Sequence, residues 1–151
     1  MSKTVEIERK FLVNNDSWLR NVSNVISIEQ MYLVNDGVKN VRIRKSEERG
    51  RVVHYLTIKS CNSGMSRVEI EHSLSDVEYN TLKGLADQGS IAKRRFAVIH
   101  GVDRWEVDVF DNGLVIAEIE IDSEDYELML PSWVGEEVTD KKEYYNADMA
   151  Q

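Results

Sequence analysis

The chain has 151 residues with 27 acidic and 19 basic side chains, and its formal net charge at pH 7 is -8. This charge repels a nucleic-acid backbone and argues against a nucleic-acid partner. The single cysteine excludes an internal disulfide, and no apolar stretch suits a signal peptide or a membrane span. We therefore expect one domain over residues 1–151, located in the cytoplasm and without a membrane partner.

Most of the chain alternates β-branched or aromatic residues with polar ones, which is the pattern of β-strands. Eight such segments are expected, at residues 4–13, 27–34, 40–46, 52–59, 66–73, 91–100, 105–110 and 115–123. Asn35-Asp36-Gly37 and Asp111-Asn112-Gly113 predict hairpin turns, because these residues tolerate a positive φ.

Two helical segments are also expected. Ser75-Asp76-Val77-Glu78 has the signature of a capping box, which predicts a helix continuing through residues 79–85. Pro131 is expected to open a short helical turn that extends to Val138.

Alternate residues of a strand share one face of a sheet, so residue parity sorts the side chains into two sets. Seven of the eight strands have one charged and one apolar face. The charged faces hold eight acids and seven bases: Glu6, Glu8, Glu69, Glu71, Glu106, Asp108, Glu118, Glu120, Lys10, Arg42, Arg44, Lys59, Arg67, Lys93 and Arg95. An ordinary sheet with its polar face in water is the alternative, but such a face mixes in many uncharged polar residues. Neighbouring like charges are destabilising unless an oppositely charged ligand lies between them.

Closing the sheet would place these charges inside and leave the apolar faces outside, to be covered by helices or a second subunit. We therefore predict a mainly β (α+β) fold, an eight-stranded antiparallel closed barrel with a charged interior and a few covering helices. The planar guanidinium of arginine can donate two hydrogen bonds to a phosphate at once, and paired glutamates can bind Mg²⁺ or Mn²⁺. The interior is thus predicted to bind a polyphosphate and a metal, and the apolar exterior makes a homodimer an option.

Several short motifs resemble one known family. Glu6-Ile7-Glu8-Arg9-Lys10 has the form ExExK that opens CYTH proteins, the triphosphate tunnel metalloenzymes. The later matches, in order, are Gln30-Met31-Tyr32-Leu33, Val41-Arg42-Ile43-Arg44, Thr57-Ile58-Lys59, Ser66-Arg67-Val68-Glu69-Ile70-Glu71, Lys93-Arg94-Arg95, Trp105-Glu106-Val107-Asp108, Glu118-Ile119-Glu120, Gly135-Glu136-Glu137-Val138-Thr139, Lys142 and Tyr144-Tyr145-Asn146. Their order is similar to that of the short bacterial branch, and they cover nearly the whole chain.

The resemblance implies metal-dependent hydrolysis of a small linear triphosphate, with inorganic triphosphate converted to diphosphate and phosphate. Thiamine triphosphatase and class IV adenylate cyclase are the enzymatic alternatives within the family. A non-enzymatic module that binds polyphosphate or nucleotides is the third alternative.

The resemblance also implies roles for individual residues. The metal ligands implied are Glu6, Glu8, Glu118 and Glu120, with Glu71 or Asp108 assisting; the phosphate ligands implied are Lys10, Arg42, Arg44, Lys59, Arg95 and Lys142. Lys141 is the alternative to Lys142, because Glu143 stands where the family often has arginine. Tyr32, helped by Lys93, is the implied proton acceptor, and a water on a metal held by Glu6 and Glu8 is the alternative. An unperturbed phenol has a pKa of about 10, so a tyrosine base predicts alkaline activity.

Overall fold

The computed structural model describes residues 2–60 and 66–150, and it gives the backbone alone for residues 2–6, 66–67 and 147. Its main feature is one antiparallel sheet of nine strands. The strands are β1 (Ser2–Val13), β2 (Val22–Asn35), β3 (Lys39–Glu48), β4 (Arg51–Ser60), β5 (Ser66–Leu74), β6 (Ser90–His100), β7 (Asp103–Phe110), β8 (Val115–Glu120) and β9 (Val134–Glu137).

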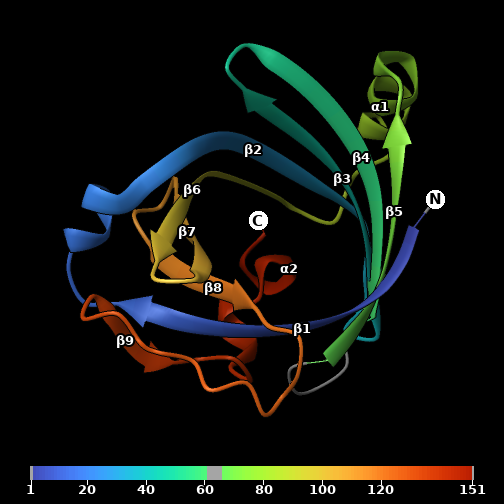
Figure 1. Ribbon diagram of the computed structural model, residues 1–151. Coiled ribbons are helices and arrows are strands. Elements are labelled where there is room, and N and C mark those ends of the chain that lie inside the picture. Colours follow the sequence, from blue (N-terminus) through green and yellow to red (C-terminus); the bar gives the residue numbers. More distant parts are fainter. Residues whose placement is uncertain (1, 61–65, 151) are drawn as a thin grey trace.

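The strand order is β5-β4-β3-β2-β6-β7-β8-β1-β9, and β1 pairs additionally with β5. The sheet curls strongly, so that its strands surround a central space (Figure 1). The mainly β antiparallel architecture is confirmed, but the sheet is not a closed ring of eight strands. There is a ninth strand, and β1 pairs with β5 over its first residues before it pairs with β8 and β9.

The described residues also form four short helical segments: η1 (Ser17–Asn21), α1 (Asp76–Lys83), η2 (Lys142–Tyr144) and α2 (Asn146–Met149). The predicted capping box is confirmed at α1, where the Ser75 hydroxyl accepts from the Glu78 amide and the Glu78 carboxylate accepts from the Ser75 amide. None of the helices in the described ranges is long and apolar enough to cross a bilayer.

The segment after Pro131 corrects the sequence prediction. The expected helical turn is instead a turn followed by β9, which pairs with the end of β1. The eighth strand also ends earlier than expected, at Glu120. The strand conformation of β9 is determined by its pairing with β1 and by the burial of Val134. Pro131, three residues before Val134, does not indicate either of these tertiary contacts.

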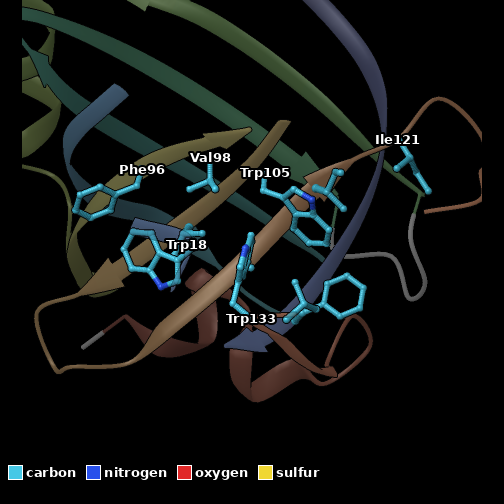
Figure 2. Close-up of a cluster of buried hydrophobic side chains, with 11 residues drawn as sticks. Trp18, Phe96, Val98, Trp105, Ile121 and Trp133 are labelled. Carbon is cyan, nitrogen blue, oxygen red and sulfur yellow. The ribbon is translucent and has the colours of Figure 1, made fainter. Parts of the chain in front are cut away.

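The hydrophobic core lies on the outer face of the sheet, opposite the charged face. Its residues come from β1, β6, β7 and β8 and from the two segments that cover them (Figure 2). Trp18 of η1 packs edge-on against Phe96, with ring centroids 5.1 Å apart, and Trp133 packs edge-on against Trp105 at 5.5 Å. As predicted, the apolar side chains of these strands lie on the outer face of the sheet. The 3₁₀ helix η1 and the chain around Trp133 cover them.

Candidate active site

The concave face of the sheet lines a pocket, called the central pocket below. Twelve of the fifteen charged-face residues predicted from strand parity line this pocket. Asp108 is fully buried and does not line it, and the side chains of Glu6 and Arg67 lie outside the described residues. The lining residues are Glu8, Lys10, Tyr32, Asn35, Gly37, Asn40, Arg42, Arg44, Lys59, Glu69, Glu71, Lys93, Arg95, Glu106, Glu118, Glu120, Lys142, Tyr145, Asn146 and Asp148. The pairing register explains this convergence, because Arg42 lies opposite Tyr32, and Lys10 lies opposite Glu118.

Arg42 and Arg44 form the basic wall on β3. Arg42 is buried, and its Nε has no hydrogen-bond partner among the described residues. Arg44 donates from Nε and Nη2 to Oε1 of Gln30, at 2.9 and 2.5 Å. Burial, together with the nearby charges of Arg42 and Arg95, lowers the pKa of Arg44 to about 9. A bound polyanion would relieve this concentration of positive charge.

Lys93 and Arg95 of β6 are anchored by one fully buried carboxylate. Arg95 donates to the two oxygens of Asp108 at 2.8 and 2.9 Å, and Lys93 Nζ lies 2.7 Å from Asp108 Oδ2. Burial opposes the ionisation of Asp108, but these two cations hold its pKa well below the ordinary value. Burial lowers the pKa of Lys93 to about 7 in spite of Asp108. Asp108 therefore orients two cations, and its assistance to a metal stays a prediction.

Acidic residues from β1, β7 and β8 form the opposite wall. Glu8 lies opposite Glu120 in the register, and Glu106 lies opposite Glu118. Burial, and then the charge of Glu118, raise the pKa of Glu8. Burial also opposes ionisation of Glu118, but Lys10 and Arg95 hold its pKa at about 2. Glu120 is exposed at the end of β8.

These carboxylates fit a divalent cation by the chemistry of their donors. Mg²⁺ and Mn²⁺ prefer oxygen ligands, and a cation between Glu8 and Glu118 would remove the repulsion that raises the Glu8 pKa. Among the described side chains, no group of three or more acidic, His or Cys residues is arranged to hold a metal. Glu6, the fourth implied ligand, falls outside the described side chains.

The remaining implied phosphate ligands are less uniform. Lys10 is buried, donates to the backbone carbonyl of Tyr144 at 3.1 Å and lies 3.5 Å from Glu118. Lys59 lies 3.2 Å from Glu69. Lys142 is 65% exposed at the rim of the central pocket and lies 3.8 Å from Asp148. Lys141 instead bonds to Glu136 and is not among the lining residues, which favours Lys142.

Tyr32 is fully buried in the wall of the central pocket. Its hydroxyl oxygen accepts a hydrogen bond from Gln30 Nε2 at 3.3 Å. Lys93 bonds to Asp108 and, at 2.8 Å, to Asn146 Oδ1 of α2. Within the described part of the chain, no hydrogen bond links Lys93 to Tyr32, so the pairing of these two residues stays a prediction.

Sequence reasoning gave no role to several residues at the central pocket, and two of them, Gln30 and Asn146, contact predicted site residues. Gln30 shares a strand face with Tyr32, but its link to Arg44 depends on the register between β2 and β3. Asn146 reaches Lys93 because η2 and α2 bring the end of the chain back to the strands, near the middle of the view in Figure 1. The motif matches at Lys142 and at Tyr144-Tyr145-Asn146 pointed to this segment, but not to the contact between Asn146 and Lys93.

Comparison with known proteins agrees with this geometry. The family model described as CYTH domain matches residues 4–151. The chain belongs to the CYTH domain family. Two relatives named inorganic triphosphatase come from Acetivibrio thermocellus and Nitrosomonas europaea. The first is 35% identical, covering 97% of this chain and 93% of the relative; the second is 30% identical, covering 96% of each.

A solved structure places the fold in the same family. The crystal structure of an inorganic triphosphatase aligns with a TM-score of 0.67 at 28% identity, over 96% of this CYTH chain and 93% of that chain. The nine-stranded curled sheet of the described residues is therefore a CYTH fold.

Proposed function

We propose that this CYTH protein hydrolyses inorganic triphosphate to diphosphate and phosphate with Mg²⁺ or Mn²⁺. The observation that carries the proposal is the charge pattern of the central pocket. Arg42 and Arg44 have no ion pair among the described residues. On the acidic side Glu8 lies opposite Glu120 in the register, and burial and the charge of Glu118 raise the pKa of Glu8. A polyanion and a cation bound together would satisfy both walls. The names of the two relatives support the same substrate.

In this proposal the basic wall binds and orients the substrate. Arg42 and Arg44 donate to phosphate oxygens, and Lys10, Lys59, Arg95 and Lys142 add positive charge around the chain of phosphates. Glu8, Glu118 and Glu120, with Glu6, would hold the metal. When bound, a divalent cation neutralises charge on the phosphoryl oxygens and acidifies a water.

The hydrolytic step needs a water in line with the bond that breaks. Water attacks the terminal phosphorus, the bond from that phosphorus to the bridging oxygen breaks, and diphosphate leaves. Tyr32 is our candidate for taking the proton from the water, because it lines the central pocket and its oxygen already accepts from Gln30. This orientation leaves the Tyr32 hydroxyl hydrogen pointing away from the Gln30 amide.

A cytoplasmic location and a homodimer are further parts of the proposal. The single cysteine supports a reducing compartment. Ile58, on the outer face of β4, is 38% exposed and lies in register between Val41 and Ile70, which supports an apolar contact with a second copy. Analytical ultracentrifugation over a concentration series tests the dimer.

A substrate panel tests the activity. Purified protein is incubated with inorganic triphosphate, thiamine triphosphate or ATP, each with Mg²⁺, with Mn²⁺ or with a chelator. We expect the highest turnover number per KM with inorganic triphosphate, and no turnover in the chelator. Preferential hydrolysis of thiamine triphosphate, cyclic AMP formed from ATP, or binding without turnover would each replace the proposal by one named alternative.

A further inference from the structure

Two arginines of the central pocket are held in place by chemically different partners. Arg95 on β6 is held by the carboxylate of Asp108, whose negative charge compensates the guanidinium. Arg44 on β3 is held in a similar two-donor contact by the amide oxygen of Gln30. An amide is neutral, so it fixes the geometry of Arg44 without cancelling its charge.

The surroundings of Arg44 preserve that charge. Within the described ranges Arg44 has no carboxylate within ion-pair distance, and its side-chain hydrogen bonds go to Gln30. Burial, and then the charges of Arg42 and Arg95, lower the pKa of Arg44, although the charges of Asp108 and Glu71 act in the opposite direction. The guanidinium of Arg44 is therefore oriented by a neutral group and has no direct ion pair within the described ranges.

Gln30 is itself fixed at both ends of its amide. The side chain is fully buried. Oε1 takes both donors of Arg44, so Nε2 must be the end that faces Tyr32, and it donates to the Tyr32 hydroxyl. The register reinforces this arrangement, because Gln30 lies opposite Arg44 and Tyr32 lies opposite Arg42. A rotation of the amide would break all three hydrogen bonds.

We propose that Gln30 is a positioning residue for triphosphate binding, which holds the Arg44 guanidinium toward the central pocket while leaving its positive charge available to the substrate. This inference rests on the proposed function for the identity of the anion. Gln30 acts through Arg44, so its effect falls on binding of the polyanion.

The substitution Gln30→Glu separates charge from geometry. Glutamate keeps an oxygen acceptor for Arg44 but adds a compensating negative charge, as Asp108 does for Arg95. We expect the KM for inorganic triphosphate to rise at least tenfold while the thermal midpoint of the ligand-free protein does not fall, because the new ion pair relieves a buried positive charge. A residue with a purely structural role would change stability and KM in the same direction.

The matched variant Gln30→Met keeps the size of the side chain and removes its polar atoms. It is expected to lower the thermal midpoint, since Arg44 and Tyr32 lose a partner, and to raise KM less than Gln30→Glu. Equal KM values for the two variants, or a parental KM for Gln30→Glu, would overturn the proposal.

A double-mutant cycle keeps the proposal testable if Gln30→Glu does not fold. Gln30→Met is measured alone and together with Arg44→Met. We expect Gln30→Met to add little to KM when Arg44 is already absent, and additive effects would overturn the inference. If the parent protein does not hydrolyse inorganic triphosphate, the proposed function has failed, and calorimetric titration of inorganic triphosphate into the same variants still tests Gln30.

Discussion

Arg42 and Arg94 are both strand arginines, and they face opposite sides of the sheet. Arg42 is buried in the wall of the central pocket, whereas Arg94 is exposed on the outer face over the ring of Phe96. We expect Arg42→Ala to weaken triphosphate binding by about 1.5 to 3 kcal/mol, or about 10- to 150-fold in KM, because a charge-assisted hydrogen bond is lost. Arg94→Ala is the matched control and should keep the parental KM. Equal effects of the two variants would show that substrate does not bind at the basic wall.

Tyr32 offers a second test at a single atom. Tyr32→Phe keeps the ring in the wall and removes only the hydroxyl group that accepts from Gln30. If Tyr32 takes the proton from water, the variant should lose the rise of rate between about pH 7 and 10 and still bind triphosphate. Initial rates over this pH range decide the point. A parental rate throughout would remove Tyr32 from the catalytic residues.

The ionisation of Glu118, a residue of the central pocket, is expected to affect the stability of the fold at acidic pH. Its folded-state pKa of about 2 lies below the ordinary value of 4.5, so the ionised group stabilises the fold above pH 4.5. This contribution is lost as the pH falls through the folded-state value. Urea unfolding in a chelator should therefore show a smaller loss of stability from about pH 4.5 to 2 for Glu118→Gln than for the parent. The same loss in both proteins would contradict the assigned ion contacts of Glu118.

Strand parity is sufficient to place side chains on a face but not to choose their partners. Parity put Lys93, Arg95 and Asp108 on the charged face, and the structure has them there. The resemblance suggested Asp108 as a helper for the metal, yet the register sets it opposite Arg95 and within reach of Lys93. Contacts between strands depend on register, which the alternation pattern of each strand does not specify.

At the scale of elements, the outer core depends on a segment with little regular structure. Trp133 precedes β9, is buried against Trp105 and covers the outer face of the sheet (Figure 2). Trp133→Ala should lower the free energy of unfolding by about 3 to 5 kcal/mol, because it leaves a cavity in this core. Val102→Ala, at a 95% exposed side chain, is the control and should change it by no more than about 0.5 kcal/mol. Urea denaturation measures the free energy of unfolding of both variants. If Trp133→Ala changed it as little as Val102→Ala does, Trp133 would not be part of the core.

The elements that were predicted correctly are those whose own residues carry the pattern, without help from tertiary contacts. Eight strands, the turn at Gly37 with φ +83°, the turn at Gly113 with φ +91° and the capped helix α1 all follow from period-two alternation or from turn and cap chemistry. β9 has four residues, too few to show a period, and forms because β1 offers it an edge. η2 and α2 are equally short, so tertiary contacts such as Lys93 with Asn146 determine where they lie.

At the scale of the whole molecule, the net charge of -8 is unevenly distributed. Arginines, lysines and glutamates line the central pocket inside the curled sheet. The buried apolar cluster lies on the outer face of the sheet (Figure 2). A charged interior costs stability unless its charges are compensated. The proposed substrate and metal complete the compensation that internal pairs such as Arg95 with Asp108 begin.

The most direct test of this account is turnover of inorganic triphosphate by the parent protein and by Glu118→Gln and Glu120→Gln, followed by phosphorus NMR with Mg²⁺, with Mn²⁺ and in a chelator. We expect one diphosphate and one phosphate per triphosphate for the parent with metal, and no turnover in the chelator. Both variants should keep the far-ultraviolet circular dichroism of the parent and lose metal-dependent turnover. Parental turnover in both variants, or undiminished turnover in the chelator, would contradict the central claim that these carboxylates hold a metal beside the substrate.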